Sequence, residues 1–113
     1  MPKTNEELSA EIFKQTTRDG CTASAPLQRR AFVTWMASGV PSGYANLAVR
    51  MNHDEPMPQN TAYPYHRCAD ALVQKLRKAE VIEVKAAKWS LTDRGQEFFE
   101  HVAETLRSER VEP

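Results

Sequence analysis

The chain has 113 residues, of which 41% are hydrophobic and 27% are charged, and its 15 basic and 15 acidic side chains give a formal net charge of zero. This length and balance predict a single domain, residues 1–113, with one core, and they exclude a disordered polymer. No apolar run reaches the roughly 18–20 residues that cross a bilayer, and the opening MPKTNEELSAE lacks the apolar segment of a secretory signal. Cys21 and Cys68 form no CxxC pair, which favours a cytoplasmic protein with reduced thiols.

Charge is unevenly distributed along the chain. Residues 20–53 hold three arginines and no acid, and residues 65–94 hold seven bases against four acids. Residues 95–113 reverse the balance, with five glutamates against two arginines. Such segregation can give a neutral molecule one basic face that attracts phosphate, and ordinary scatter of surface charge is the alternative. The outcome depends on whether Arg29, Arg30 and Arg50 share a face with the lysines of residues 75–88.

The N-terminal third predicts two helices separated by a loop. Residues 5–17 are expected to be helical, with Thr4 as N-cap and Glu7 in the capping-box position. The segment RDGCTASAP predicts a loop, and residues 26–38 predict a second helix on whose polar side Gln28 lies. The apolar stripes of these helices are Leu8, Ile12, Phe13, Leu27, Ala31, Phe32, Trp35 and Met36.

The middle of the chain predicts two further helices. Residues 43–51 are expected to form a helix with Ser42 as N-cap and Asn46 facing outward. Residues 52–63, NHDEPMPQNTAY, contain two prolines and no apolar period, which predicts a long loop. The next helix is expected over residues 64–79, with its proline at the N1 position. Its inward positions are Ala69, Leu72, Val73 and Leu76.

The C-terminal third predicts a hairpin and a last helix. Residues 81–84 and 89–92 are β-prone runs joined by KAAK, a basic four-residue turn, and together they predict a hairpin over residues 81–92. Val84 or Ile82 is expected to contact Trp89 or Leu91 across the strands.

The last helix, with an apolar stripe containing Phe98, Val102 and Leu106, is expected to begin after a cap at Thr92 or Asp93. It is expected to end near residue 107. The predicted fold class is mainly α with a small β-hairpin (α+β), with a core over about residues 26–107 and frayed ends at residues 1–4 and 108–113.

Several segments resemble parts of a known domain. AFVTWMASGVPSGYANLAVRM is similar to the first two helices of winged helix-turn-helix domains, and ALVQKLRKAEVIEV is similar to the end of a recognition helix and the start of a wing. KWSLTDRGQEFFEHV resembles the second wing strand and the following helix of MarR-like regulators. The sequence Leu-Thr-acid-base-Gly is common there. The resemblance covers about residues 27–104 and implies a winged helix-turn-helix with additional N- and C-terminal helices. Two departures are the longer, proline-rich loop of residues 52–63 and the short wing.

The resemblance implies a DNA-binding surface on the helix of residues 64–79 and on the hairpin. Arg67 and Gln74 are expected to read guanine and adenine in the major groove, and the lysines are expected to hold phosphates. The N-terminus of the third helix is expected to bond phosphate as well. The predicted DNA-binding residues are Ser42, Asn46, Arg67, Asp70, Gln74, Lys75, Lys78, Lys85 and Lys88. The alternative is that these side chains are only the solvated face of an amphipathic helix.

Other chemistry finds little support in the sequence. His66 and Cys68 lie two residues apart, but no second pair with ligand spacing follows, so no metal site is expected. GxGxxG, GxxxxGK[ST] and GxSxG motifs are absent and the acids form no suggestive pair, so we expect no cofactor, no catalytic residues and no enzyme. Tyr63 and Tyr65 are expected to pack the long loop onto the core, with stacking on sugars or bases as the alternative.

The leading hypothesis is a cytoplasmic protein that binds double-stranded DNA, as a transcriptional regulator, with the helix of residues 64–79 in the major groove. The alternative is a winged-helix module for protein–protein assembly in a larger complex, without DNA binding; zero net charge and the acidic tail favour it. The stripes of the first and last helices either close the single core or form a homodimer interface. A third hypothesis adds a small-molecule effector between the core and the outer helices, and no residue cluster indicates its identity.

Overall fold

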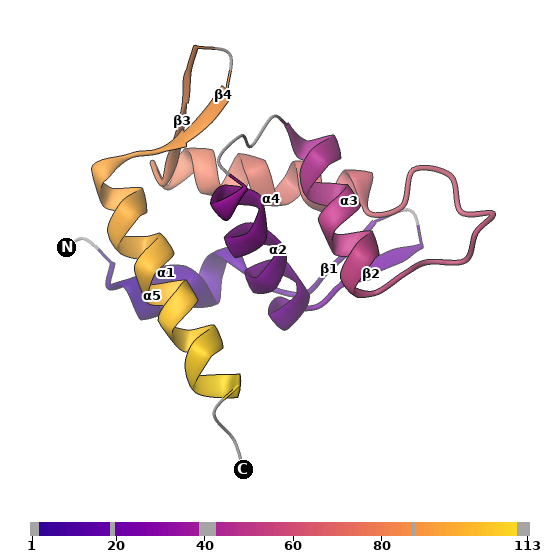
Figure 1. Cartoon of the computed structure of the whole chain (residues 1–113), viewed down its shortest axis with the longest axis horizontal. Helices are drawn as coiled ribbons and strands as arrows, with labels where there is room; N and C mark the ends of the chain where they lie inside the picture. The colour runs from indigo at the N-terminus through magenta and orange to yellow at the C-terminus, as the bar shows by residue number, and fades with distance from the viewer. Residues whose placement is uncertain (1–2, 19, 39–42, 87, 111–113) are drawn as a thin grey trace.

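The computed structural model describes residues 3–18, 20–38, 43–86 and 88–110, most of which are helical (Figure 1). The helices are α1 (Asn5–Ile12), α2 (Ala25–Ala37), α3 (Tyr44–Asp54), α4 (His66–Lys78) and α5 (Asp93–Arg110). Two antiparallel hairpins join β1 (Thr16–Arg18) to β2 (Cys21–Ala23) and β3 (Ile82–Lys85) to β4 (Lys88–Leu91). The predicted class, mainly helical α+β with a small hairpin, is confirmed. Within the described ranges, no helix combines the length and apolar character that a membrane span requires.

The first predicted helix starts correctly but is too long. The Glu7 N–H donates to Thr4 Oγ1 at 3.1 Å, and the Thr4 N–H donates to the Glu7 carboxylate at 3.2 Å, which confirms the capping box. However, α1 ends at Ile12, and β1 and β2 replace the predicted end of the helix and part of the predicted loop. The β-branched threonines of TTR favour a strand, and Gly20, with φ of 80°, occupies the turn.

One core joins the five helices. The ring of Phe13 stacks on Phe98 with centroids 5.8 Å apart, and Phe32 contacts both rings at the same separation. Trp35 of α2 is fully buried beside them in the same cluster. The buried part of the two stripes, which is Leu8, Ile12, Phe13, Phe98 and Val102, therefore belongs to one core, whereas Leu106 is half-buried and lies outside that cluster.

The segment between α3 and α4 differs from its prediction at both ends. α3 continues past residue 51 to Asp54, and α4 begins at His66, so Pro64 does not occupy the N1 position. Tyr65 is the N-cap residue, with φ of 62°, and its buried side chain donates through the phenolic hydroxyl to the Glu55 carbonyl at 2.7 Å. This bond joins the two ends of the loop. The predicted cap at Ser42 lies outside the described residues.

The β3–β4 hairpin forms between the predicted strands but has a shorter turn than predicted. Ile82 pairs with Leu91 and Val84 pairs with Trp89, and Lys85 lies opposite Lys88. Only residues 86 and 87 connect the strands, so the predicted four-residue turn is wrong, as expected where right-handed strand twist favours two-residue turns. The hairpin projects from the body near the C-terminal end of α4 (Figure 1).

The start of α5 is fixed against the chain that links α4 to β3. Thr92 Oγ1 accepts a hydrogen bond from the Gly95 N–H at 2.8 Å, which confirms the predicted cap at Thr92. The Thr92 N–H donates to the Val81 carbonyl at 3.1 Å. A Cβ atom on Gly95 would lie only 1.8 Å from that same carbonyl oxygen, so the position requires glycine. The LTDRG segment thus determines how α5 leaves the hairpin.

Candidate functional site

α4 divides its side chains between a core face and an open face. Its buried residues are Cys68, Ala69, Leu72, Val73 and Leu76. Arg67, Asp70, Gln74 and Lys78 are exposed, and their helical spacing aligns them in one stripe on the opposite side. Four of the predicted site residues therefore share a surface that the rest of the described chain leaves open; we call these four residues the α4 stripe.

Lys75 does not belong to the α4 stripe. Its ammonium group extends toward α1 and donates to the carbonyl oxygen of Ile12 at 3.5 Å. Desolvation lowers the pKa of Lys75, and the positive charges of Arg18 and Lys14 lower it further. Lys75 thus lies in a partly buried, positively charged environment between α1 and α4.

Lys85 and Lys88 form a separate exposed pair near the end of the β3–β4 hairpin. Lys85 Nζ lies 3.4 Å from Glu83 Oε1, and both side chains are largely solvated. Ion pairs of this kind contribute little because water and salt screen them, so Lys85 can exchange its partner readily. The two lysines therefore extend the positive charge beyond the C-terminal end of α4.

Asn46 belongs to α3 and not to the α4 stripe. It lines a hollow between α2 and α3 together with Thr34, Val49 and Arg50. Its side-chain oxygen is buried and has no hydrogen-bond partner among the described residues. No other predicted DNA contact among the described residues lines this hollow, and Ser42 lies outside the described ranges.

The N-terminal end of α4 carries an exposed aromatic group that was only partly anticipated. The His66 ring lies 5.4 Å from the ring of Tyr63 and 5.9 Å, edge-on, from the ring of Tyr44. Tyr63 is 76% exposed and Tyr44 is 44% exposed. Tyr65 packs the loop as predicted, whereas Tyr63 remains open to solvent. Tyr44 gave no sequence signal, because it is a single aromatic residue in the first turn of α3 and belongs to no pattern.

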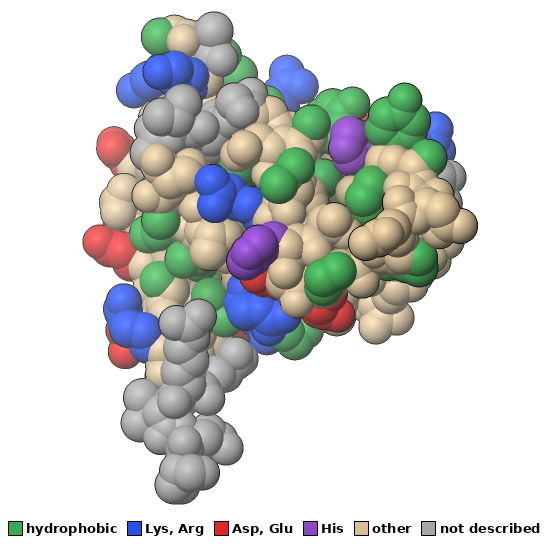
Figure 2. All heavy atoms as spheres, turned by 45° about the vertical axis from the view of Figure 1, so that its right-hand side comes forward, with side chains coloured by type: hydrophobic (Ala, Val, Ile, Leu, Met, Phe, Trp, Pro, Cys, Tyr) green, Lys and Arg blue, Asp and Glu red, His purple; other side chains and the backbone are tan. Residues whose placement is uncertain are grey.

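The arginines of α2 and α3 do not join the lysines of α4. Arg30 pairs with Asp54 at 3.6 Å and with Glu55 at 3.4 Å, at the C-terminal end of α3. Arg50 lines the hollow between α2 and α3, whereas Lys75 and Lys78 line a cleft against α1. Figure 2 shows Lys and Arg side chains in separate groups on the face drawn. Arg30 and Arg50 therefore do not line the cleft that Lys75 and Lys78 line, and the charge segregation along the sequence does not gather these four cations at one site.

His66 and Cys68 have different environments and do not form a pair of ligands. The Cys68 thiol is buried and donates to the carbonyls of Thr16 and Cys21, each at 3.5 Å, so it fastens β1–β2 to α4. Burial raises the pKa of the Cys68 thiol, which keeps it protonated and unreactive. Within the described ranges, no group of three or more His, Cys, Asp and Glu side chains is placed to hold a metal ion.

The structure thus brings only some of the predicted DNA-binding residues together on one surface. The α4 stripe lies on one helix face, the hairpin lysines lie beyond that helix, and Lys75 and Asn46 line separate hollows. Comparison with models of protein families, with curated proteins and with solved structures finds no match to the chain. A functional proposal therefore depends on the chemistry of these residues alone.

Proposed function

We propose that the chain is a winged helix-turn-helix protein that binds duplex DNA and regulates transcription, with α4 as the recognition helix and β3–β4 as the wing. The observation that carries the proposal is the open polar face of α4, the α4 stripe, on a helix whose other face is held in the core. The B-DNA major groove, about 12 Å wide, accepts a helix presented in this way. The order α3, α4, hairpin is also the order of these elements in a winged helix.

The side chains of the α4 stripe divide by chemistry. Arg67 donates to guanine O6 and N7, Gln74 forms paired bonds with adenine, and the Asp70 carboxylate accepts from the cytosine amino group. Lys78, Lys85 and Lys88 contact phosphates, which orient the protein without reading sequence. Lys75 is not assigned a DNA contact because its ammonium group points toward α1.

Exposed hydrophobic side chains favour a second candidate function, assembly with another protein. Tyr44, Val49, Tyr63 and Val84 are between 44% and 76% exposed. Large apolar side chains are enriched at the centres of protein interfaces. The same aromatic groups can stack on sugars or bases beside Arg67, so the two candidates are separated by measuring duplex binding directly.

Fluorescence anisotropy with a pool of mixed-sequence duplexes, followed by selection of the tightest binders, tests the proposal. The wild-type chain is expected to bind at low salt and to select a preferred sequence. Arg67→Ala with Gln74→Ala is expected to lose about 1–3 kcal/mol of discrimination per base contact, while non-specific affinity falls less. Lys78→Ala with Lys85→Ala and Lys88→Ala is expected to weaken binding to all sequences.

The matched control is Arg107→Ala, because Arg107 is an exposed arginine on α5 that pairs with Glu104 at 2.6 Å. This variant is expected to bind DNA as the wild type does. Absence of duplex binding at low salt contradicts the proposal and leaves protein assembly as the candidate. Wild-type affinity in the triple lysine variant contradicts the assignment of the phosphate contacts.

A further inference from the structure

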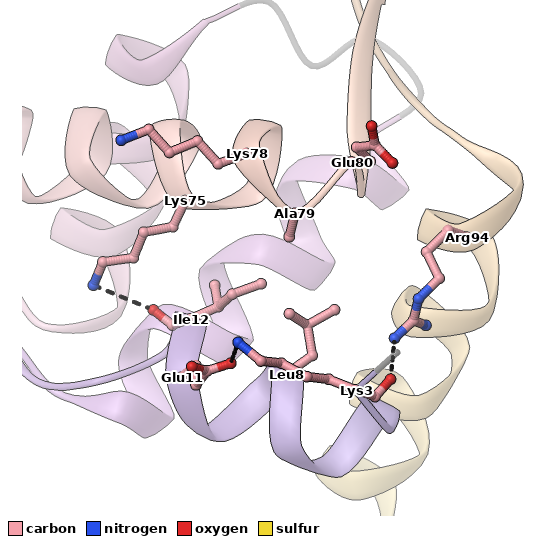
Figure 3. A pocket seen from close by; sticks show the side chains of 9 residues that line it. All are labelled: Lys3, Leu8, Glu11, Ile12, Lys75, Lys78, Ala79, Glu80 and Arg94. Atoms are coloured by element: carbon pink, nitrogen blue, oxygen red, sulfur yellow. Dashed lines mark hydrogen bonds and ion pairs between the residues drawn. The ribbon is translucent and has the colours of Figure 1, made fainter. Parts of the chain in front are cut away.

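A cleft of about 640 Å³ lies between α1, the C-terminal end of α4 and the start of α5 (Figure 3). This volume is within the range of about 300–1,000 Å³ that is common for small-molecule sites. Leu8 and Ile12 of α1 and Ala79, which follows α4, form an apolar floor. Charged side chains from three separate parts of the chain surround that floor, so the cleft is amphipathic.

The cations of the cleft are only partly neutralised. Lys3 Nζ lies 2.5 Å from Glu11 Oε2, and this pair is self-contained. The Arg94 guanidinium donates to the side-chain oxygen of Asn5 and, at 3.1 Å, to the Lys3 carbonyl, which are both uncharged acceptors. Arg94 therefore lacks a carboxylate partner among the described residues.

Lys75 and Lys78 lie one above the other at the opposite side of the cleft (Figure 3). Lys75 has the long bond to the Ile12 carbonyl, and Lys78 forms no ion pair with any described residue. Glu80, the remaining acid of the lining, lies at the end near Arg94 (Figure 3). Both ammonium groups end on the same side of the cleft, and neither of the two lining carboxylates, Glu11 and Glu80, lies between them (Figure 3).

Placing positive charge in a partly buried site is costly unless an anion accompanies it. The lowered pKa of Lys75, caused by desolvation and by Arg18 and Lys14, is consistent with this cost. The described chain supplies no anion at this point, whereas a bound carboxylate between the two ammonium groups would accept charge-assisted hydrogen bonds from both.

We propose that this cleft is a binding site for a small carboxylate with an apolar body. The carboxylate lies between the Lys75 and Lys78 ammonium groups, and the apolar body covers Leu8 and Ile12. The site shares Lys78 with the α4 stripe, so a bound carboxylate would compete with the phosphate contact proposed for Lys78, whereas Lys75, Leu8 and Ile12 take no part in the proposed DNA binding.

Isothermal titration of the full chain with 2-naphthoate and with its neutral analogue 2-naphthamide tests this proposal. The two probes share one apolar body and differ in charge. The wild type is expected to bind one naphthoate per chain about tenfold or more tightly than naphthamide. Lys75→Met and Lys78→Met keep much of each apolar stem but remove its charge, so each is expected to weaken naphthoate and leave naphthamide unchanged. The double variant is expected to bind both probes equally.

Lys88→Met is the matched control, since Lys88 is an exposed lysine on the hairpin, and it is expected to retain the wild-type preference. Thermal unfolding of each variant checks that it folds. If Lys75→Met does not fold, the proposal is tested with Lys78→Met, because Lys78 is exposed. Amide chemical shifts are expected to change around Ile12 and Ala79 when naphthoate binds. The proposal would be overturned if the wild type bound both probes equally or bound no naphthoate at about 1 mM. It would also be overturned if the lysine variants kept the full preference for naphthoate, or if the shift changes were confined to other elements.

Discussion

At Gly95 the first turn of α5 contacts the backbone of Val81, and its Cα hydrogens are the only groups that fit there. A Cβ atom would lie 1.8 Å from the Val81 carbonyl oxygen and 2.7 Å from its carbon. Because backbone rather than a flexible side chain fills this space, Gly95→Ala must displace α5 or β3. The variant is expected to lose about 3 kcal/mol of unfolding free energy, measured by urea denaturation.

Gly43→Ala is the control for this substitution, since a Cβ atom on Gly43 meets nothing within 4 Å and its φ of 177° is open to alanine. Its expected loss is below about 1 kcal/mol. Equal losses in the two variants would contradict the close approach at Val81. The contact also gives a structural reason for the glycine of the LTDRG segment.

At the scale of elements, Gln28 connects α2 to the β1–β2 hairpin. Its side chain is 1% exposed, and Nε2 donates to the carbonyls of Lys14 and Ala23 at 2.6 Å and 2.9 Å. Gln28→Ala leaves both acceptors without this donor and opens a cavity, so a loss of about 2–3 kcal/mol of unfolding free energy is expected. Gln74→Ala, on the open face of α4, is expected to change it by less than about 0.5 kcal/mol. Similar losses of unfolding free energy in both variants would show that the hydrogen bonds of Gln28 to Lys14 and Ala23 do not stabilise the fold.

The same residues explain which elements could be predicted. Local signals located most helices and the two strands of the β3–β4 hairpin, although they left its partner pairs open, because capping and apolar spacing act within a few residues. The β1–β2 hairpin escaped prediction because its strands are short and depend on distant groups, namely Gln28 and the Cys68 thiol. Helical spacing placed Gln28 on a polar face, since periodicity cannot reveal that an amide is buried to satisfy two carbonyls. The prediction that Gln28 belongs to the polar side of the helix is therefore wrong, because the side chain is buried.

The part of the candidate site that lies within one helix could be predicted from the sequence. The part whose side chains are positioned by neighbouring elements could not. The α4 stripe follows from the spacing of polar residues within α4. Lys75 lies at the boundary between that stripe and the core, and only the position of α1 determines where its ammonium group points. Likewise, the ion pairs of Arg30 depend on the extension of α3 to Asp54, which the sequence did not predict.

For the whole molecule, the division of positive charge determines how DNA binding should respond to salt. If Lys78, Lys85 and Lys88 neutralise about three phosphates, a logarithmic plot of affinity against salt concentration is expected to have a slope of about −2.7. Lys85→Ala with Lys88→Ala is expected to reduce that slope by about 1.8, because two released counterions are lost. Arg30→Gln removes a cation that is already paired with Asp54 and Glu55 in another region, and is expected to leave the slope unchanged. Anisotropy titrations at several salt concentrations measure all three slopes. A reduction by Arg30→Gln equal to that of the hairpin variant would place the duplex across α2 and α3 instead of α4, because only cations near phosphate release counterions on binding.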